Sequence, residues 1–207
     1  MTPHLPLISA TIVDELASFG RFAYARGWIP ARSGNFSRRI DDRHAAITRS
    51  GVDKNAITAD DVMIVALDGP IPQGVSAEAP LHVARYRADR TVDAVLHLHS
   101  VAATVLSREN AARGYIEFNG YEMQKAIRAE VTHERTLRLP VVSNAQDTAK
   151  LAAAVEKILA SASDVPAYLL ASHGLYVWGE SMQEAQRHVE GLEFLLQCTL
   201  EERRMDR

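Results

Sequence analysis

Short apolar runs with strand-like spacing, interrupted irregularly by helical patterns, limit what this chain can fold into. The segments expected to contain strands, some with a terminal turn, are 32–40, 44–51, 62–70, 91–99, 137–142 and 167–179. Helical patterns occupy 11–26, 76–89, 101–107, 120–127, 149–161 and the stretch from Met182 to about Arg203. Strands and helices do not alternate strictly, and several strands are close enough in sequence to form hairpins. The pattern therefore predicts an α/β protein with a mixed, largely antiparallel sheet covered by helices.

Composition narrows the class of protein. The chain has 207 residues and is 47% hydrophobic, so we expect residues 1–207 to form a single domain. The formal net charge is −3 and no long run of like charge occurs, which indicates neither a nucleic-acid partner nor a membrane surface. The single cysteine, Cys198, excludes an internal disulfide and fits a reducing, cytoplasmic compartment. No signal-peptide pattern and no apolar run of about 18 residues is present, so no membrane span is expected.

Two histidines stand two residues apart at the end of an apolar run. His97 and His99 follow the segment TVDAVL. Residues i and i+2 of a strand face the same side, so the two imidazoles project together. They could be hydrogen-bonded core histidines, or they could chelate one metal ion. Their spacing at a strand end favours the metal.

A third histidine strengthens the metal interpretation. His173 lies between the apolar segment AYLLAS and Gly174, where the chain must turn sharply. Three histidines with one open position are the pattern of catalytic rather than structural zinc. Imidazole ligands also suit Fe, Co, Ni and Cu, so these residues alone leave the metal open.

Five segments together resemble the class II aldolase/adducin family. They are RSGNFS (32–37), TRSGV (48–52), SAEAPLH (76–82), HLHS (97–100) and SHGLYVWG (172–179), in the order typical of the family. Within the family, GYEMQKAI (120–127), SHGLYVWG and the long C-terminal helix look most like the branch that acts in methionine salvage. That branch dehydrates 5-methylthioribulose 1-phosphate to 2,3-diketo-5-methylthiopentyl 1-phosphate.

The resemblance implies a structure and a cofactor. It implies a three-layer α/β/α fold with a central, mostly antiparallel mixed sheet. It implies one Zn²⁺ per subunit, bound by His97, His99 and His173. It also implies a homotetramer with active sites near the subunit interfaces.

The resemblance also predicts a phosphate site at three short turns, Ser33-Gly34-Asn35, Ser50-Gly51 and Ser76-Ala77. Backbone N–H groups and hydroxyls in such turns can cradle a dianion. The family usually has two serines before its glutamate, but this chain has Ser76-Ala77, so one hydroxyl contact is missing. The predicted phosphate-binding residues are Ser33, Gly34, Asn35, Ser50, Gly51 and Ser76.

Two glutamates compete for the acid/base role. Glu78 matches the catalytic glutamate of the family's sugar-phosphate aldolases, and otherwise it is a first-turn carboxylate favoured by the helix dipole. Glu122 matches the proposed acid/base of the dehydratase, and otherwise it is a surface residue paired with Lys125. We expect Glu122 to be the main acid/base and Glu78 to support it near the metal.

Two other functions remain open on the sequence. An aldolase or 4-epimerase would use the same metal and phosphate cradle, with Glu78 as the base of the aldolase. A non-enzymatic assembly module of the adducin type would have no need for three metal-binding histidines.

Overall fold

One mixed sheet forms the centre of the computed structural model, which describes residues 6–127, 132–162 and 165–205. The sheet has eight strands in the order β3-β2-β1-β4-β8-β7-β6-β5. The strands are β1 (Asn35–Arg39), β2 (His44–Thr48), β3 (Val62–Ala66), β4 (Ala94–Leu98), β5 (Tyr115–Phe118), β6 (Leu137–Val142), β7 (Ala167–Leu170) and β8 (Gly174–Gly179). Neighbouring strands run antiparallel except for β6 and β7, which are parallel.

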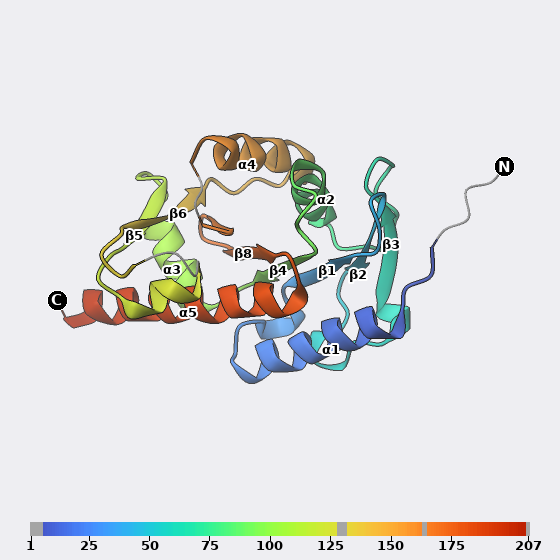
Figure 1. Cartoon of the computed structure of the whole chain (residues 1–207), viewed down its shortest axis with the longest axis horizontal. Coiled ribbons are helices and arrows are strands. Elements are labelled where there is room, and N and C mark those ends of the chain that lie inside the picture. Colours follow the sequence, from blue (N-terminus) through green and yellow to red (C-terminus); the bar gives the residue numbers. More distant parts are fainter. Residues whose placement is uncertain (1–5, 128–131, 163–164, 206–207) are drawn as a thin grey trace.

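Helices cover both faces of this sheet (Figure 1). The helices are α1 (Ala10–Ala25), α2 (Ala79–Ala88), α3 (Val101–Glu109), α4 (Thr148–Ala162) and α5 (Met182–Met205). Helices α1, α3 and α5 pack on one face, around Leu96 and Leu98 of β4. Helices α2 and α4 pack on the other face, around Val95 and Tyr176. The predicted three-layer α/β/α fold with a mostly antiparallel sheet is confirmed.

Short 3₁₀ helices complete the structure. They are η1 (Pro30–Arg32), η2 (Lys54–Ala56), η3 (Ala59–Asp61) and η4 (Glu122–Ala126). Most predicted elements are present within a few residues of their expected bounds. Strand β5 was not predicted, and β4 ends at Leu98, so His99 lies one residue beyond the strand rather than within it.

Close backbone contacts at the end of β4 determine where the site forms. In the antiparallel ladder between β1 and β4, Asn35 pairs with His97. Gly34 precedes β1 with φ +77°, and a Cβ there would lie 2.6 Å from the carbonyl oxygen of His97. Gly174 begins β8, and a Cβ there would lie 2.1 Å from the carbonyl oxygen of Leu98. Only glycine allows these segments to approach β4 so closely.

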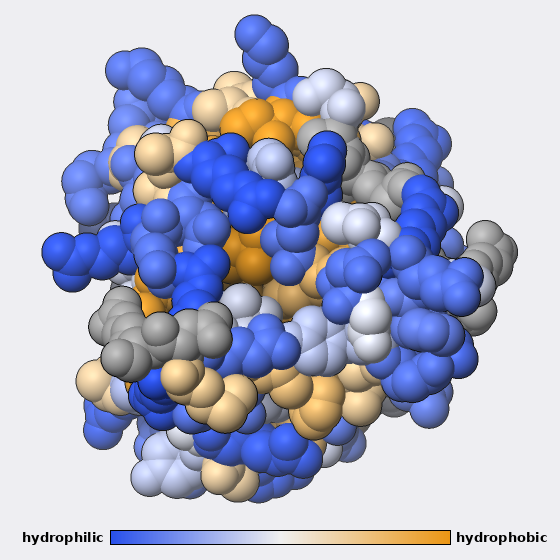
Figure 2. All heavy atoms as spheres, turned by 90° about the vertical axis from the view of Figure 1, so that its left-hand side faces the viewer, coloured by the Kyte–Doolittle hydropathy of each residue, from blue (hydrophilic) through white to orange (hydrophobic). Residues whose placement is uncertain are grey.

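Strand β5 forms the edge of the sheet on one side. It lies four positions from β4 in the sheet. The end of the molecule that carries it is largely hydrophilic, with hydrophobic residues showing between the hydrophilic ones (Figure 2). Within the described ranges, no helix combines the length and apolar character needed to cross a membrane.

Candidate active site

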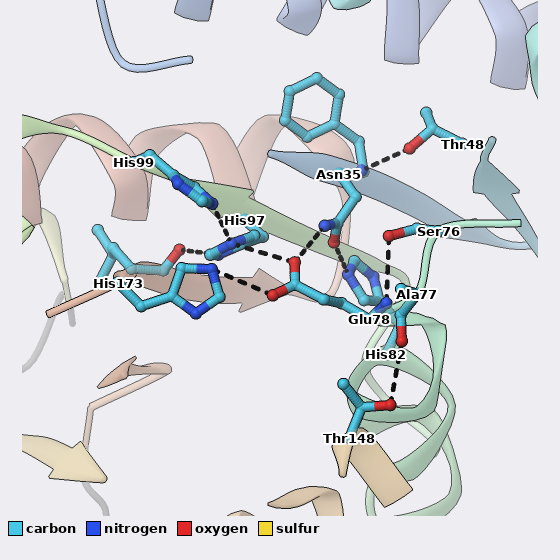
Figure 3. Close-up of polar contacts among 12 residues, drawn as sticks. Asn35, Thr48, Ser76, Ala77, Glu78, His82, His97, His99, Thr148 and His173 are labelled. Carbon is cyan, nitrogen blue, oxygen red and sulfur yellow. Dashed lines mark hydrogen bonds and ion pairs between the residues drawn. The ribbon is translucent and has the colours of Figure 1, made fainter. Parts of the chain in front are cut away.

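Three histidines and one glutamate meet at the end of β4. Ligand atoms of Glu78, His97, His99 and His173 all lie within 4.8 Å of one another. The Nε2 atoms of His97 and His99 are 2.7 Å apart. The Glu78 carboxylate faces the other side of the group, 3.3 Å from Nε2 of His97 and 3.1 Å from Nε2 of His173 (Figure 3). The structure thus brings the three predicted histidine ligands together and adds a carboxylate.

The hydrogen bonding of His97 fits a metal ligand. Its Nδ1 lies 3.1 Å from the carbonyl oxygen of Leu175, which can only accept, so Nδ1 carries the proton. The Nε2 lone pair of the neutral ring then points at Nε2 of His99. Burial lowers the pKa of His97 well below its usual value and lowers the pKa of His99 to about 4. Neutral imidazoles beside a carboxylate are a set of ligands that a divalent cation stabilises.

Packing and backbone contacts hold the rings in place. His97 stacks on Tyr176 with ring centroids 3.9 Å apart. The backbone N–H of His99 donates to the carbonyl oxygen of Trp28 at 2.8 Å. His173 lies in the turn between β7 and β8, after Ser172 with φ +59°. The Thr104 hydroxyl on α3 lies 2.8 Å from the carbonyl oxygen of Ser100 and 3.0 Å from that of His173, so α3 also contacts the turn that carries the third histidine.

Glu78 reaches the histidines from the start of α2. It is the N-cap residue of that helix, yet its side chain caps no backbone N–H. Its carboxylate instead accepts a hydrogen bond from Asn35 Nδ2 at 2.6 Å. The first-turn position expected from the sequence is correct, but the side chain is turned toward the histidines.

A cleft of about 360 Å³ opens beside this cluster. Five of the six predicted phosphate-binding residues line it: Gly34, Asn35, Ser50, Gly51 and Ser76. The sixth, Ser33, is not among the lining residues, and its buried hydroxyl has no hydrogen-bond partner in the described structure. The predicted turns therefore converge on one cavity next to Glu78, His99 and His173.

The details of the predicted phosphate cradle differ from the expectation. The backbone N–H groups of Ser50 and Ser76 already donate to the carbonyl oxygens of Gly74 and Thr48. The Asn35 amide is bonded to Glu78 and His82. Ser76 Oγ accepts from the N–H of Glu78 at 3.3 Å, so its own proton is free to donate. Hydroxyls rather than these backbone groups are available to a phosphate.

Cationic side chains supply positive charge, which the turns lack. Arg32, Arg49 and Lys54 all line the cleft. Lys54 is 3% exposed and donates to the carbonyl oxygen of Arg32 at 3.0 Å. Burial lowers the pKa of Lys54. Lys54 was not among the predicted site residues; its position shortly after the TRSG turn was the available signal.

A second set of lining residues was also missed. Asn144, Gln146 and Thr148 border the cleft where α4 begins. The Thr148 hydroxyl donates to the carbonyl oxygen of Ala77 at 3.0 Å. Helix α4 therefore contacts the turn in which alanine replaces the family's second serine.

The structure does not bring Glu122 to the cluster. It begins η4, and its side chain is 68% exposed and paired with Lys125 Nζ at 2.5 Å and His133 Nδ1 at 3.1 Å. The hydrogen bond from Lys125 lowers the pKa of Glu122. Within this chain, the arrangement matches the surface-pair alternative for Glu122, and Glu78 is the carboxylate at the histidines.

Comparison with known proteins places this geometry in a family. Residues 14–200 match the class II aldolase and adducin N-terminal domain. The chain belongs to this family. It is 45% identical to a methylthioribulose-1-phosphate dehydratase of Parvibaculum lavamentivorans, over 98% of both chains. It is 46% identical to a protein of the same name from Marinobacter nauticus, over 96% of this chain and 97% of the other.

Solved structures agree with the fold. An L-fuculose-1-phosphate aldolase from Thermus thermophilus superposes with a TM-score of 0.78 at 28% identity, covering 95% of this chain and 97% of the aldolase. A sugar-phosphate aldolase from Thermotoga maritima gives 0.72 at 16% identity, covering 95% and 97%. The second likeness concerns the fold alone.

Proposed function

We propose that this protein is a metal-dependent dehydratase of 5-methylthioribulose 1-phosphate, producing 2,3-diketo-5-methylthiopentyl 1-phosphate in methionine salvage. The observation that carries the proposal is the convergence of three histidines and Glu78 beside a cationic cleft. The relatives of the same length named as this dehydratase supply the substrate.

The proposed cofactor is Zn²⁺, one per subunit, held by His97, His99 and His173. Three histidine ligands with an open position suit zinc, and the Nδ1 proton of His97 is already directed at a backbone carbonyl oxygen. Bound there, zinc would supply a Lewis acid for the substrate's C2 carbonyl and C3 hydroxyl oxygens.

The cleft beside the cluster is proposed to hold the substrate phosphate. The hydroxyls of Ser50 and Ser76 can donate to phosphate oxygens, and the charges of Arg49 and Lys54 attract the dianion. Anchored in this cleft, the sugar chain extends toward Glu78 and the histidines, which orients C3 for proton abstraction.

Glu78 is the proposed acid/base within the subunit. Its carboxylate takes the proton from C3, the C4–O bond breaks, and the C4 hydroxyl leaves as water with a proton from a general acid. The resulting enol tautomerises to the 2,3-diketone. A positioned acid/base contributes roughly 10²–10⁴ in rate.

A role for Glu122 in this reaction requires a second subunit. In one chain it points away into a surface ion pair, so a neighbouring copy would have to present it to the cleft. The family resemblance to tetramers with sites near subunit interfaces is the reason to keep Glu122 as a candidate. Homotetramer formation, a cytoplasmic location and a single domain over residues 1–207 remain predictions.

An aldolase is the second candidate, and one observation favours it. The glutamate found at the histidines is Glu78, which matches the catalytic position of the family's aldolases. An aldolase would cleave C3–C4 in the same cleft instead of breaking C4–O. The 45% identical relatives favour dehydration over this alternative.

The test is to supply the zinc-loaded protein with 5-methylthioribulose 1-phosphate and to follow the products by mass spectrometry and carbon NMR. Loss of one water from an intact five-carbon chain, abolished in His97→Ala, is expected. Cleavage to a three-carbon ketose phosphate and an aldehyde would establish the aldolase. Absence of both turnover and bound metal would overturn the enzyme assignment.

Two glutamine variants test which glutamate is the acid/base. Glu78→Gln should lose activity by roughly 10²–10⁴-fold. Glu122→Gln should do so only if a neighbouring subunit brings Glu122 to the cleft. Glu117→Gln is the matched control, because Glu117 is also a carboxylate paired with surface cations, Arg113 and Arg138.

A further inference from the structure

A line of buried polar side chains leads away from Glu78 into the layer between the sheet and α2. Asn35 and Ser37 lie on β1, and His82 and Tyr86 lie on α2. All four are at most 4% exposed. None of them belongs to the metal cluster, and burying such groups is costly unless each one is hydrogen-bonded.

The four side chains and Glu78 are linked by short contacts. Asn35 Nδ2 lies 2.6 Å from Glu78 Oε2, and Asn35 Oδ1 lies 2.5 Å from His82 Nε2 (Figure 3). His82 Nδ1 lies 2.7 Å from Ser37 Oγ. Ser37 Oγ lies 2.8 Å from the Tyr86 hydroxyl. The line is continuous from Tyr86 to the carboxylate.

The chemistry of the groups gives this line a direction. A carboxylate only accepts, so the Asn35 amide must present its NH₂ to Glu78 and its oxygen to His82. His82 Nε2 therefore carries the proton and donates to Asn35. Burial lowers the pKa of His82 to about 3, so the ring is neutral and Nδ1 must accept from the Ser37 hydroxyl.

The far end follows the same direction. With its proton used on His82, Ser37 Oγ accepts from the Tyr86 hydroxyl at 2.8 Å. The competing acceptor for Tyr86, the carbonyl oxygen of Asp93, is farther away at 3.4 Å. Every donor then points toward Glu78, and aligned hydrogen bonds polarise one another.

We propose that Asn35, His82 and Ser37 are positioning residues that hold the Glu78 carboxylate in the orientation required for proton transfer. The inference rests on the proposed function, since it gives these residues a task only if Glu78 is the acid/base. Glu78 needs such support because it caps no helix N–H and its flexible side chain must stay against the histidines. Asn35 is suited to the task because it pairs with His97 in the sheet, so one ladder places both the metal ligand and the clamp.

Two variants of His82 separate positioning from simple packing. His82→Gln keeps a donor for Asn35 and an acceptor for Ser37, whereas His82→Leu keeps the bulk and loses both. We expect His82→Leu to lower kcat about 10–100-fold with KM and zinc content unchanged, and His82→Gln to retain most of the activity. An equal loss of kcat in both variants would overturn the proposal. A loss of kcat that is explained entirely by a smaller fraction of folded or zinc-bound protein would overturn it as well.

Asn35→Asp tests the clamp directly. It keeps the shape of the side chain but replaces the NH₂ group that donates to Glu78 with a carboxylate oxygen. Because two carboxylates then face each other, kcat should fall at least as far as in His82→Leu. Wild-type kcat in Asn35→Asp would contradict a positioning role. Ser37→Ala and Tyr86→Phe should have progressively smaller effects, because they remove links farther from the carboxylate.

Nitrogen NMR of His82 in the wild-type protein provides a test that needs no turnover. We expect a neutral ring protonated at Nε2 and unprotonated at Nδ1 between pH 6 and 8. A ring protonated at Nδ1, or at both nitrogens, would break the direction of the line and overturn the proposal. If the expected tautomer is found in a protein that does not turn over the substrate, the assigned reaction fails rather than the hydrogen-bonded line.

Discussion

Replacing Gly174 with alanine should weaken metal binding without touching a ligand. Gly174 is the first residue of β8 and follows His173 directly. A Cβ at this position would lie 2.1 Å from the carbonyl oxygen of Leu98 and 3.1 Å from Cε1 of His97. Because a carbon atom normally stays about 3.3 Å or more from a carbonyl oxygen, β4 and β8 would have to separate by about 1 Å.

That displacement has two expected consequences. Overpacking of this kind costs about 1–3 kcal/mol of folding stability. Metal-ligand distances tolerate only about 0.2 Å, so moving His97 relative to His173 by about 1 Å should lower zinc affinity. A loss of about 10–100-fold is the size seen when the support of metal ligands is disturbed.

Zinc affinity is measured by competition with a chromophoric chelator, and stability by urea unfolding of the metal-free protein. Gly114→Ala is the control: Gly114 has φ +80° and a Cβ there would meet no atom within 4 Å. It should cost about 1–2 kcal/mol in backbone strain and leave zinc affinity unchanged. Wild-type zinc affinity in Gly174→Ala would refute the reasoning that the glycine sets the distance between the histidines.

Three further predictions concern buried ionisable side chains. Lys54→Met should raise KM about tenfold or more with little change in kcat, because a charge-assisted hydrogen bond is worth about 1.5–3 kcal/mol. An unchanged KM in steady-state assays would exclude Lys54 from phosphate binding. Burial lowers the pKa of His82 to about 3, so below pH 6.5 the unfolded chain takes up a proton that the native protein does not. Stability of the metal-free protein should therefore fall by about 1.4 kcal/mol per pH unit from this group, and urea unfolding at pH 6 and 5 should show a slope shallower by that amount in His82→Gln. Burial raises the pKa of Glu193 on α5 from 4.5 to about 7, so stability is lost as pH rises through this range and the full loss is present above pH 7. Glu193→Gln should therefore raise stability at pH 8 by about 3 kcal/mol in the same assay.

Local patterns in the sequence were sufficient for most of the fold. The period of apolar residues identified α1, α4 and α5 almost to the residue. The missed strand β5 (Tyr115–Phe118) has only four residues. Its pairing partner β6 begins about twenty residues later, so nothing local distinguished it from a loop.

Some site residues are placed by local strand geometry, and others are placed by contacts between segments that are distant in the sequence. The two imidazoles of His97 and His99 project together because of strand geometry, which is local. The approach of His173 to them depends on Gly174 crossing the end of β4, and sequence spacing alone does not show that distance. The acid/base assignment depended on resemblance, and in the folded chain Glu78 lies at the histidines whereas the Glu122 side chain is 68% exposed.

The Asn35 side chain shows which contacts the sequence alone could not assign. From sequence it was one member of a small polar turn, and any such residue can serve a phosphate. In the fold, its pairing with His97 places the amide between a carboxylate and a neutral histidine, and each of those neighbours accepts only one orientation of the amide. Its role therefore follows from the hydrogen-bonding capacity of residues 43 and 47 positions away along the chain, which becomes visible only when β1 and α2 are packed together.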